Sequence, residues 1–179
     1  MKTEEELIWE SYIRFNESLD NPYSWQDDFK TEEEVDDWDD TGEEYAKEVL
    51  TPVQIIRFKT DEGLEYAWYS RQNRMNETYW EIAFGVVKGE NSRGGLDLDI
   101  EKTGTGNAFR VFATVIDITN RFIEFDENYE VQHLTFSSKG QNRTRLYKKY
   151  LVPKIEDFKL SYENSDGLDE TEIHLERIF

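Results

Sequence analysis

The chain has no cysteine and only two histidines, His133 and His174, among its 179 residues. Without cysteine it can form neither a disulfide framework nor a thiolate metal site, and two histidines alone argue against a zinc site. No run of about 18 apolar residues occurs, which argues against a transmembrane helix. The start of the chain, from Met1 to Glu6, is acidic where a secretory signal peptide is basic. These absences predict a soluble protein that folds in a reducing compartment.

Basic residues are scarce relative to acidic ones. The chain carries 21 lysines and arginines against 40 aspartates and glutamates, which gives a formal net charge of −19. This charge opposes binding to nucleic-acid phosphates and to anionic membranes, both of which attract lysine and arginine. It favours a protein partner with a basic surface. We therefore expect no direct contact with nucleic acid and no membrane association.

The negative charge is concentrated near the N-terminus. Residues 27–44 hold eleven carboxylates and a single lysine, Lys30. The chain as a whole is 37% hydrophobic and 15% aromatic, which is enough for a folded core despite the acidic run. We expect an N-terminal helical and acidic segment over residues 1–50 and one α+β domain over residues 51–179.

Two helices are expected in the N-terminal segment. Apolar residues recur at helical spacing over residues 3–18, and Pro22 ends that pattern. A second helix is expected over about residues 42–50. Aromatic residues such as Trp25, Phe29 and Trp38 are spaced through the acidic run, which indicates that this segment packs against the rest of the protein.

From Pro52 onward the hydrophobic pattern alternates with a period of two, which is typical of strands. The expected strands cover residues 53–58, 64–69, 78–87, 96–100, 131–136 and 173–178. The first four form an antiparallel meander. Two helices pack on the sheet, one at about residues 107–124 and one from Asn142, an N-cap candidate, to about Pro153. The predicted fold class is α+β, with a mixed, mostly antiparallel sheet of about six strands.

The order of these elements resembles that of the GNAT superfamily of acyl-CoA N-acetyltransferases. A Gly-x-Gly loop follows the fourth strand, and Asn142, Leu146 and Tyr147 match the family's later Asn and Leu-Tyr pattern. The resemblance implies a GNAT-like fold over about residues 53–179, in which the fourth and fifth strands splay apart to admit the cofactor. It implies that acetyl-CoA binds at the glycine loop and at Asn142, with Tyr147 as general acid. The loop residues concerned are Gly104, Gly106, Asn107 and Ala108.

One residue beside the loop argues against this activity. Glu101 stands where the family has glutamine or arginine. A carboxylate about 5 Å from a pyrophosphate charge costs about 3 kcal/mol at an effective dielectric of about 20, unless Lys102 or Arg110 compensates. We therefore expect a non-catalytic protein without a cofactor, and the acetyl-CoA-dependent N-acetyltransferase is the alternative.

The chain also resembles a group of uncharacterised tailed-phage proteins. The likeness lies in residues 104–115, where the glycine loop opens an apolar helix, and in residues 136–147, which end in Leu-Tyr. This resemblance implies a phage protein that acts in the cytoplasm of an infected bacterial host or in the virion.

The acidic run has a calcium-binding interpretation. Its spacing matches an EF-hand loop, with Gly42 at the bend. The ligands would be Asp37, Asp39, Thr41, Glu43 and Glu48.

The acidic run also has an interpretation as a mimic of DNA. Closely spaced carboxylates can imitate phosphates and occupy the basic groove of a nuclease or a repressor, while interleaved aromatic side chains anchor the interface. The residues expected to contact the partner are Trp25, Phe29, Glu33, Asp36, Asp37, Trp38, Asp39 and Asp40. The leading prediction is a non-catalytic acidic protein that binds a basic surface of a host or virion protein. A solvated acidic arm that only confers solubility is the other interpretation.

Overall fold

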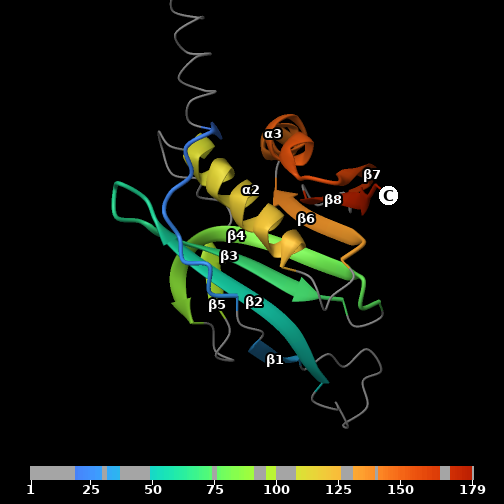
Figure 1. Ribbon diagram of the computed structural model, residues 1–179, viewed down its shortest axis with the longest axis horizontal. Helices are drawn as coiled ribbons and strands as arrows, with labels where there is room; N and C mark the ends of the chain where they lie inside the picture. Colours follow the sequence, from blue (N-terminus) through green and yellow to red (C-terminus); the bar gives the residue numbers. More distant parts are fainter. Residues whose placement is uncertain are drawn as a thin grey trace, which may run out of the picture.

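The computed structural model describes residues 19–29, 32–36, 49–73, 76–90, 96–99, 108–125, 131–139, 141–165 and 170–178 (Figure 1). The strands are β1 (Glu32–Asp36), β2 (Val49–Lys59), β3 (Glu65–Gln72), β4 (Tyr79–Glu90), β5 (Leu96–Asp99), β6 (His133–Lys139), β7 (Phe158–Ser165) and β8 (Glu170–Arg177). The helices are α2 (Ala108–Glu124) and α3 (Gln141–Leu146), and α3 continues into a π-helical turn (Tyr147–Leu151) and a 3-10 turn (Val152–Lys154).

The strands form one mixed sheet in the order β1-β2-β3-β4-β6-β8-β7, with β5 paired beside β6 on the same edge of β4. All neighbouring strands are antiparallel except β4 and β6, which run parallel because α2 crosses over between them. The prediction of an α+β fold with a mixed, mostly antiparallel sheet is confirmed, as is the meander from β2 to β5.

The structure also corrects the predicted elements. The predicted helix over residues 42–50 is wrong at its end, because Val49 and Leu50 begin β2 and pair with Asp36 and Val35 of β1. Strand β1 was not expected inside the acidic run. Strand β7 was missed as well, and it contains a bulge between Leu160 and Tyr162 that interrupts the alternating pattern. The predicted helix over residues 3–18 lies outside the described residues.

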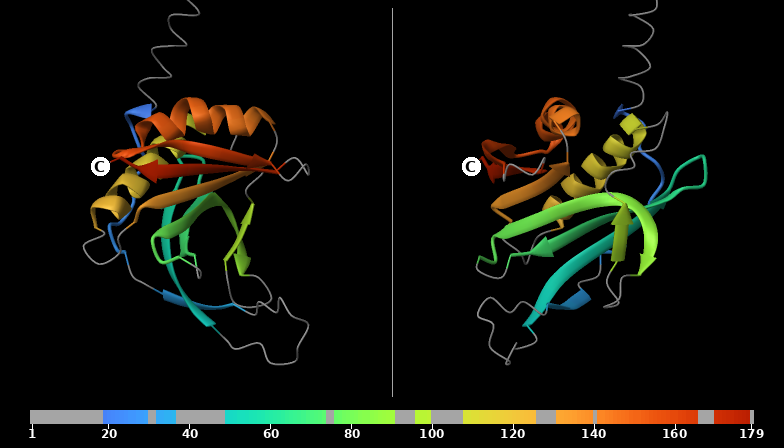
Figure 2. Two further views of the ribbon diagram at one scale, coloured as in Figure 1. Left: turned by 90° about the vertical axis from the view of Figure 1, so that its right-hand side faces the viewer. Right: turned by 180° about the vertical axis from the view of Figure 1, so that it is seen from behind.

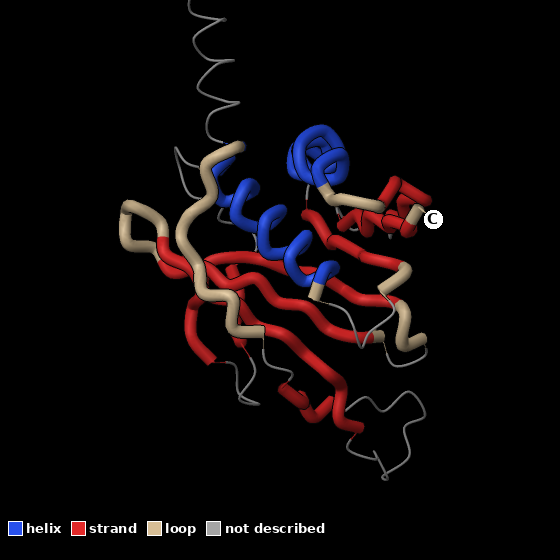
Figure 3. Tube along the Cα trace, in the orientation of Figure 1, coloured by secondary structure: helices blue, strands red, loops and turns tan. Residues whose placement is uncertain are grey.

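Helix α2 crosses one face of the sheet and covers the core (Figures 2 and 3). The aromatic side chains of β3 and β4 on that face meet Phe122 of α2, with ring centroids 5.4 Å from Trp68 and 5.1 Å from Trp80. The indole Nε1 of Trp68 donates a hydrogen bond of 3.0 Å to Thr119 Oγ1 inside this interface. Buried aromatic area of this kind supplies much of the free energy that holds a helix on a sheet.

None of the helices in the described part of the chain combines the length and the apolar character needed to cross a membrane.

Candidate functional site at the acidic edge of the sheet

Strand β1 forms the outer edge of the sheet beyond β2. Four of its five residues are carboxylates, Glu32, Glu33, Glu34 and Asp36. Its backbone pairs antiparallel with β2, from Glu32 opposite Val53 to Asp36 opposite Val49. Part of the acidic run is therefore an ordered strand on the rim of the sheet, where an acidic sequence with modest strand propensity is tolerated because one side of the strand is open.

The chain that leads into β1 is fastened along α2. A polar stripe on α2, made of Arg110, Thr114, Asp117 and Arg121, holds this N-terminal segment. The backbone N–H of Tyr23 donates to Thr114 Oγ1 at 2.8 Å, and Trp25 Nε1 donates to Asp117 Oδ2 at 2.7 Å. One turn further on, Arg121 Nε donates to Asp27 Oδ2 at 2.7 Å.

Phe29 anchors the same segment by aromatic packing. Its ring centroid lies 6.0 Å from Trp25, 6.0 Å from Trp68, 6.0 Å from Phe122 and 5.8 Å from Phe125. The expectation that the aromatic residues pack against the protein body therefore holds for Trp25 and Phe29. These two rings contact the protein's own core and helix and so position the chain that leads into the acidic strand, while their role as anchors for a partner stays a prediction.

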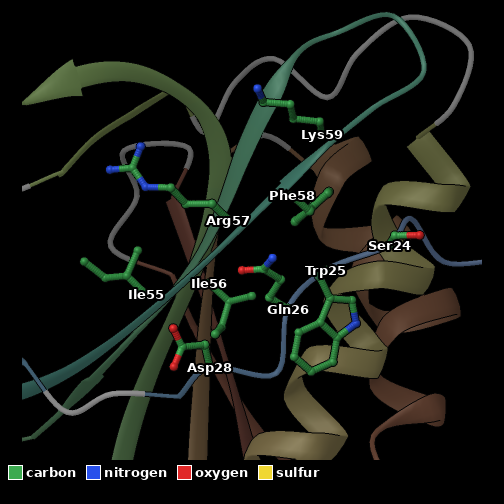
Figure 4. Close-up of a pocket in the computed structure, with 9 residues that line it drawn as sticks. All are labelled: Ser24, Trp25, Gln26, Asp28, Ile55, Ile56, Arg57, Phe58 and Lys59. Carbon is green, nitrogen blue, oxygen red and sulfur yellow. The ribbon is translucent and has the colours of Figure 1, made fainter.

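A cleft of about 530 Å³ lies between this segment and β2 (Figure 4). Trp25 bridges to Phe58, and Glu32 pairs with Val53. Between these two contacts the N-terminal segment advances seven positions along the chain, whereas β2 advances only five, and the difference leaves the cleft between them. The cleft is lined by Ser24, Trp25, Gln26, Asp28, Ile55, Ile56, Arg57, Phe58 and Lys59. The lining includes the carboxylate of Asp28 and the cations of Arg57 and Lys59. Because both signs of charge are present, the cleft favours neither an anionic nor a cationic ligand.

The other acidic residues expected to contact a partner lie only partly within the described residues. Glu33 and Asp36 lie in β1, while Asp37, Trp38, Asp39 and Asp40 lie outside the described residues. The predicted calcium ligands, Asp37, Asp39, Thr41, Glu43 and Glu48, also lie outside them. Within the described residues no cluster of three or more histidine, aspartate or glutamate side chains could hold a metal ion.

The predicted cofactor residues are divided in the same way. Gly104, Gly106 and Asn107 lie outside the described residues, and Ala108 is the first residue of α2. The prediction of Asn142 as an N-cap is wrong, because α3 already begins at Gln141. Arg110, one of the two cations that would offset Glu101, is engaged elsewhere. Its Nη1 lies 2.5 Å from Asp61 Oδ2.

Tyr147 is a core residue where β5 and β6 diverge. Strand β6 pairs with Tyr79 to Ile82 of β4 and β5 pairs with Val86 to Glu90, so Phe84 lies between the two paired stretches. The Tyr147 ring stacks on Phe84 at 5.5 Å and meets Phe112 edge-on at 5.7 Å. Only 2% of Tyr147 is exposed. Burial raises the pKa of Tyr147 to about 12, against a smaller opposing effect of the Arg143 charge.

A cluster of polar side chains that the sequence did not reveal lies on the face of the sheet opposite α2. His174 Nδ1 lies 3.0 Å from Thr135 Oγ1, and its Nε2 lies 3.3 Å from Glu172 Oε2. Tyr162 stacks on the imidazole at 4.0 Å. Thr135 and His174 are 39 positions apart, and only the pairing of β6 with β8 brings them together. Thr135 is 8% exposed, so this line of groups links two strands and offers poor access for a substrate.

Comparison of the chain with models of protein families, with curated proteins and with solved structures gave no match. The resemblances to GNAT enzymes and to tailed-phage proteins therefore stay predictions.

Phe29→Ala tests whether the N-terminal segment is part of the folded body. The substitution removes a ring that contacts four other aromatic rings, so we expect the free energy of unfolding to fall by about 2 kcal/mol in urea titrations. Leu64→Ala, in a turn and 41% exposed, is the control, with an expected loss below about 1 kcal/mol. Equal losses in the two variants would contradict this arrangement.

Tyr147→Phe tests the burial of the phenol. Its folded pKa of about 12 exceeds the unfolded value of 10.0, so stability is complete below pH 10.0 and is lost as the pH rises toward 12. Between pH 8 and pH 11.5 we expect the wild type to lose about 2 kcal/mol more unfolding free energy than Tyr147→Phe. Tyr162→Phe, at a position that is 53% exposed, should keep the wild-type loss. Identical alkaline losses in wild type and Tyr147→Phe would refute the burial argument.

Proposed function

We propose that this protein is non-catalytic and acts by presenting the acidic edge strand β1 to a basic protein surface, in the manner of a DNA mimic. The observation that carries the proposal is that four of the five residues in the strand at the rim of the sheet are acidic. A mimic needs its charges held in place, because flexible side chains on a flexible segment lose conformational entropy on binding.

The spacing of the charges supports mimicry. An antiparallel strand advances about 3.4 Å per residue, and one strand of duplex DNA carries one phosphate per about 3.4 Å of helix axis. Counted over both faces of the strand, consecutive glutamates such as Glu32, Glu33 and Glu34 therefore carry as many charges per unit length as a single DNA strand. A nuclease, a repressor or another basic nucleic-acid-binding protein is the partner class that this density suits.

The fastening of the preceding chain also supports this function. Hydrogen bonds from Trp25 to Asp117 and from Arg121 to Asp27 tie the segment to α2, so the start of β1 is held relative to the sheet. The resemblance to tailed-phage proteins would make the target a protein of the infected bacterial host or a basic virion protein. The partner contacts would lie in the cytoplasm of that host or in the virion.

The direct test is displacement of fluorescent duplex DNA from a panel of purified bacterial nucleases and repressors. We expect the wild type to release DNA from at least one of them. A variant with Glu32→Gln, Glu33→Gln, Glu34→Gln and Asp36→Asn should compete at least about tenfold more weakly, because phosphate-like contacts are lost. Fluorescence anisotropy reads the displacement.

The matched control removes the same amount of charge from other exposed positions. It carries Glu77→Gln, Glu81→Gln, Glu156→Gln and Glu176→Gln. This control should compete like the wild type. If the two variants weaken equally, net charge and not β1 is responsible. If neither displaces less DNA than the wild type, the acidic edge has no part in binding.

The alternative function, acetyl-CoA-dependent N-acetyl transfer, has two structural observations against it. Tyr147, its proposed acid, is closed off by Phe84 and Phe112. Arg110 is bonded to Asp61 and to the carbonyl oxygen of Asn21, so it is not available to neutralise a diphosphate.

Thermal unfolding with acetyl-CoA separates the two functions. A ligand at 100 times its Kd stabilises the folded state by about 2.7 kcal/mol, which raises Tm by about 5 °C or more in a protein of this size. We expect no shift at millimolar acetyl-CoA. An acetyltransferase known to bind the cofactor serves as positive control, and a clear rise in Tm would restore the enzymatic alternative.

A further inference from the structure

Strand β7 forms the edge of the sheet opposite β1, and no strand pairs with its outer side among the described residues. Every residue from Lys159 to Asn164 is exposed. Two of them are large and apolar, Leu160 at 39% exposure and Tyr162 at 53%. An edge of this length with exposed apolar side chains is a template for pairing with another strand. Strand β1, in contrast, is protected from such pairing by its own like charges.

The backbone of β7 has groups directed outward. The N–H of Ile178 donates to the carbonyl oxygen of Asp157 at 2.6 Å, which makes these two residues a hydrogen-bonded pair at the start of the β7–β8 ladder. Since bonded and non-bonded pairs alternate along an antiparallel ladder, Phe158 and Leu160 direct their N–H and C=O groups away from β8. The bulge between Leu160 and Tyr162 follows this stretch and leaves it intact.

The helical segment that begins with α3 runs beside β7 and β8 (Figure 2), and it is rich in basic residues. Residues 141–154 contain Arg143, Arg145, Lys148, Lys149 and Lys154 and no carboxylate, although the whole chain carries a net charge of −19. Lys148 Nζ lies 2.5 Å from Glu163 Oε1, which ties the π-helical turn to β7. Arg145 and Lys149, one turn apart, are exposed on the same surface, and no carboxylate of the described residues forms a salt bridge with either side chain.

We propose that the β7 edge receives an extended acidic segment of a partner protein as an additional strand. The main chain of Phe158 and Leu160 supplies hydrogen bonds, as in other cases of strand addition. The bulge places Leu160 and Tyr162 on opposite faces of the sheet, so each offers an apolar contact to a side chain on a different face of the incoming strand. Arg145 and Lys149 attract its carboxylates. An acidic segment is the occupant that this surface favours, because a basic segment would meet like charges there.

The probe for this edge is a capped, fluorescent peptide with the sequence of residues 31–37, Thr-Glu-Glu-Glu-Val-Asp-Asp, which is the acidic strand that the chain itself carries. Its control is the same peptide with every carboxylate replaced by the corresponding amide. We expect the acidic peptide to bind the full-length protein and the amide peptide to bind at least about tenfold more weakly. Equal binding of the two peptides would remove the electrostatic part of the proposal.

Two variants of the protein locate the binding. Leu160→Pro removes an outward N–H without removing a bond to β8, and proline is tolerated on edge strands, so peptide binding should be lost while circular dichroism stays unchanged. The pair Arg145→Glu and Lys149→Glu should weaken binding about tenfold and leaves the hydrogen-bonded ladder untouched. The matched pair Lys59→Glu and Lys88→Glu changes the net charge equally and should bind the peptide like the wild type.

Peptide binding that survives both Leu160→Pro and the Arg145→Glu and Lys149→Glu pair would overturn the proposal. Equal weakening by the Lys59→Glu and Lys88→Glu pair would overturn it as well, because net charge would then be the cause. Assemblies of the wild-type chain that grow with concentration in sedimentation and vanish with Leu160→Pro would show that a second copy occupies the edge, and would overturn the choice of an acidic partner segment.

Discussion

The contact between α2 and one face of the sheet is the interaction on which the other features depend. Ten of the seventeen residues of α2 are buried, and Phe122 packs against both Trp68 and Trp80 of the sheet. The hydrogen bond from Trp68 to Thr119 satisfies the indole N–H inside this apolar layer, where an unpaired donor would be costly. The helix also forms the crossover that makes β6 parallel to β4, and so it determines the order of the strands.

The side of α2 that faces away from the core determines the position of the acidic edge. Thr114, Asp117 and Arg121 bind the chain just before β1, and Phe29 joins that chain to the same aromatic cluster. A segment with this much negative charge would otherwise gain more from hydration than from packing. The fastening therefore depends on α2 presenting both an apolar and a polar side, and it turns part of the acidic run into a strand.

The order of the strands places an acidic and a basic region of the surface far apart. The acidic strand β1 and the basic surface above β7 lie at opposite ends of the sheet (Figure 1). At physiological salt the Debye length is about 8 Å, so surface charges at the two ends hardly influence each other. The two proposals therefore do not conflict: β1 is proposed to bind a basic surface and the β7 edge an acidic segment, although the net charge of the chain is strongly negative. The buried Tyr147 and the ion-paired Arg110 favour the proposed role of the edges over the enzymatic alternative.

The sequence by itself determined the elements with strong local patterns. The alternating residues of β2, β3 and β4 and the continuous apolar pattern of α2 predicted these elements closely, because their burial repeats with the period of the backbone. The sequence also showed the acidic run and its aromatic residues. Only the tertiary structure decided that Glu32–Asp36 is a strand, that Phe29 meets Trp68, that β7 exists despite its bulge, and that Thr135 meets His174. These features depend on contacts between residues far apart in the chain, and such contacts leave no periodic signal in the local sequence.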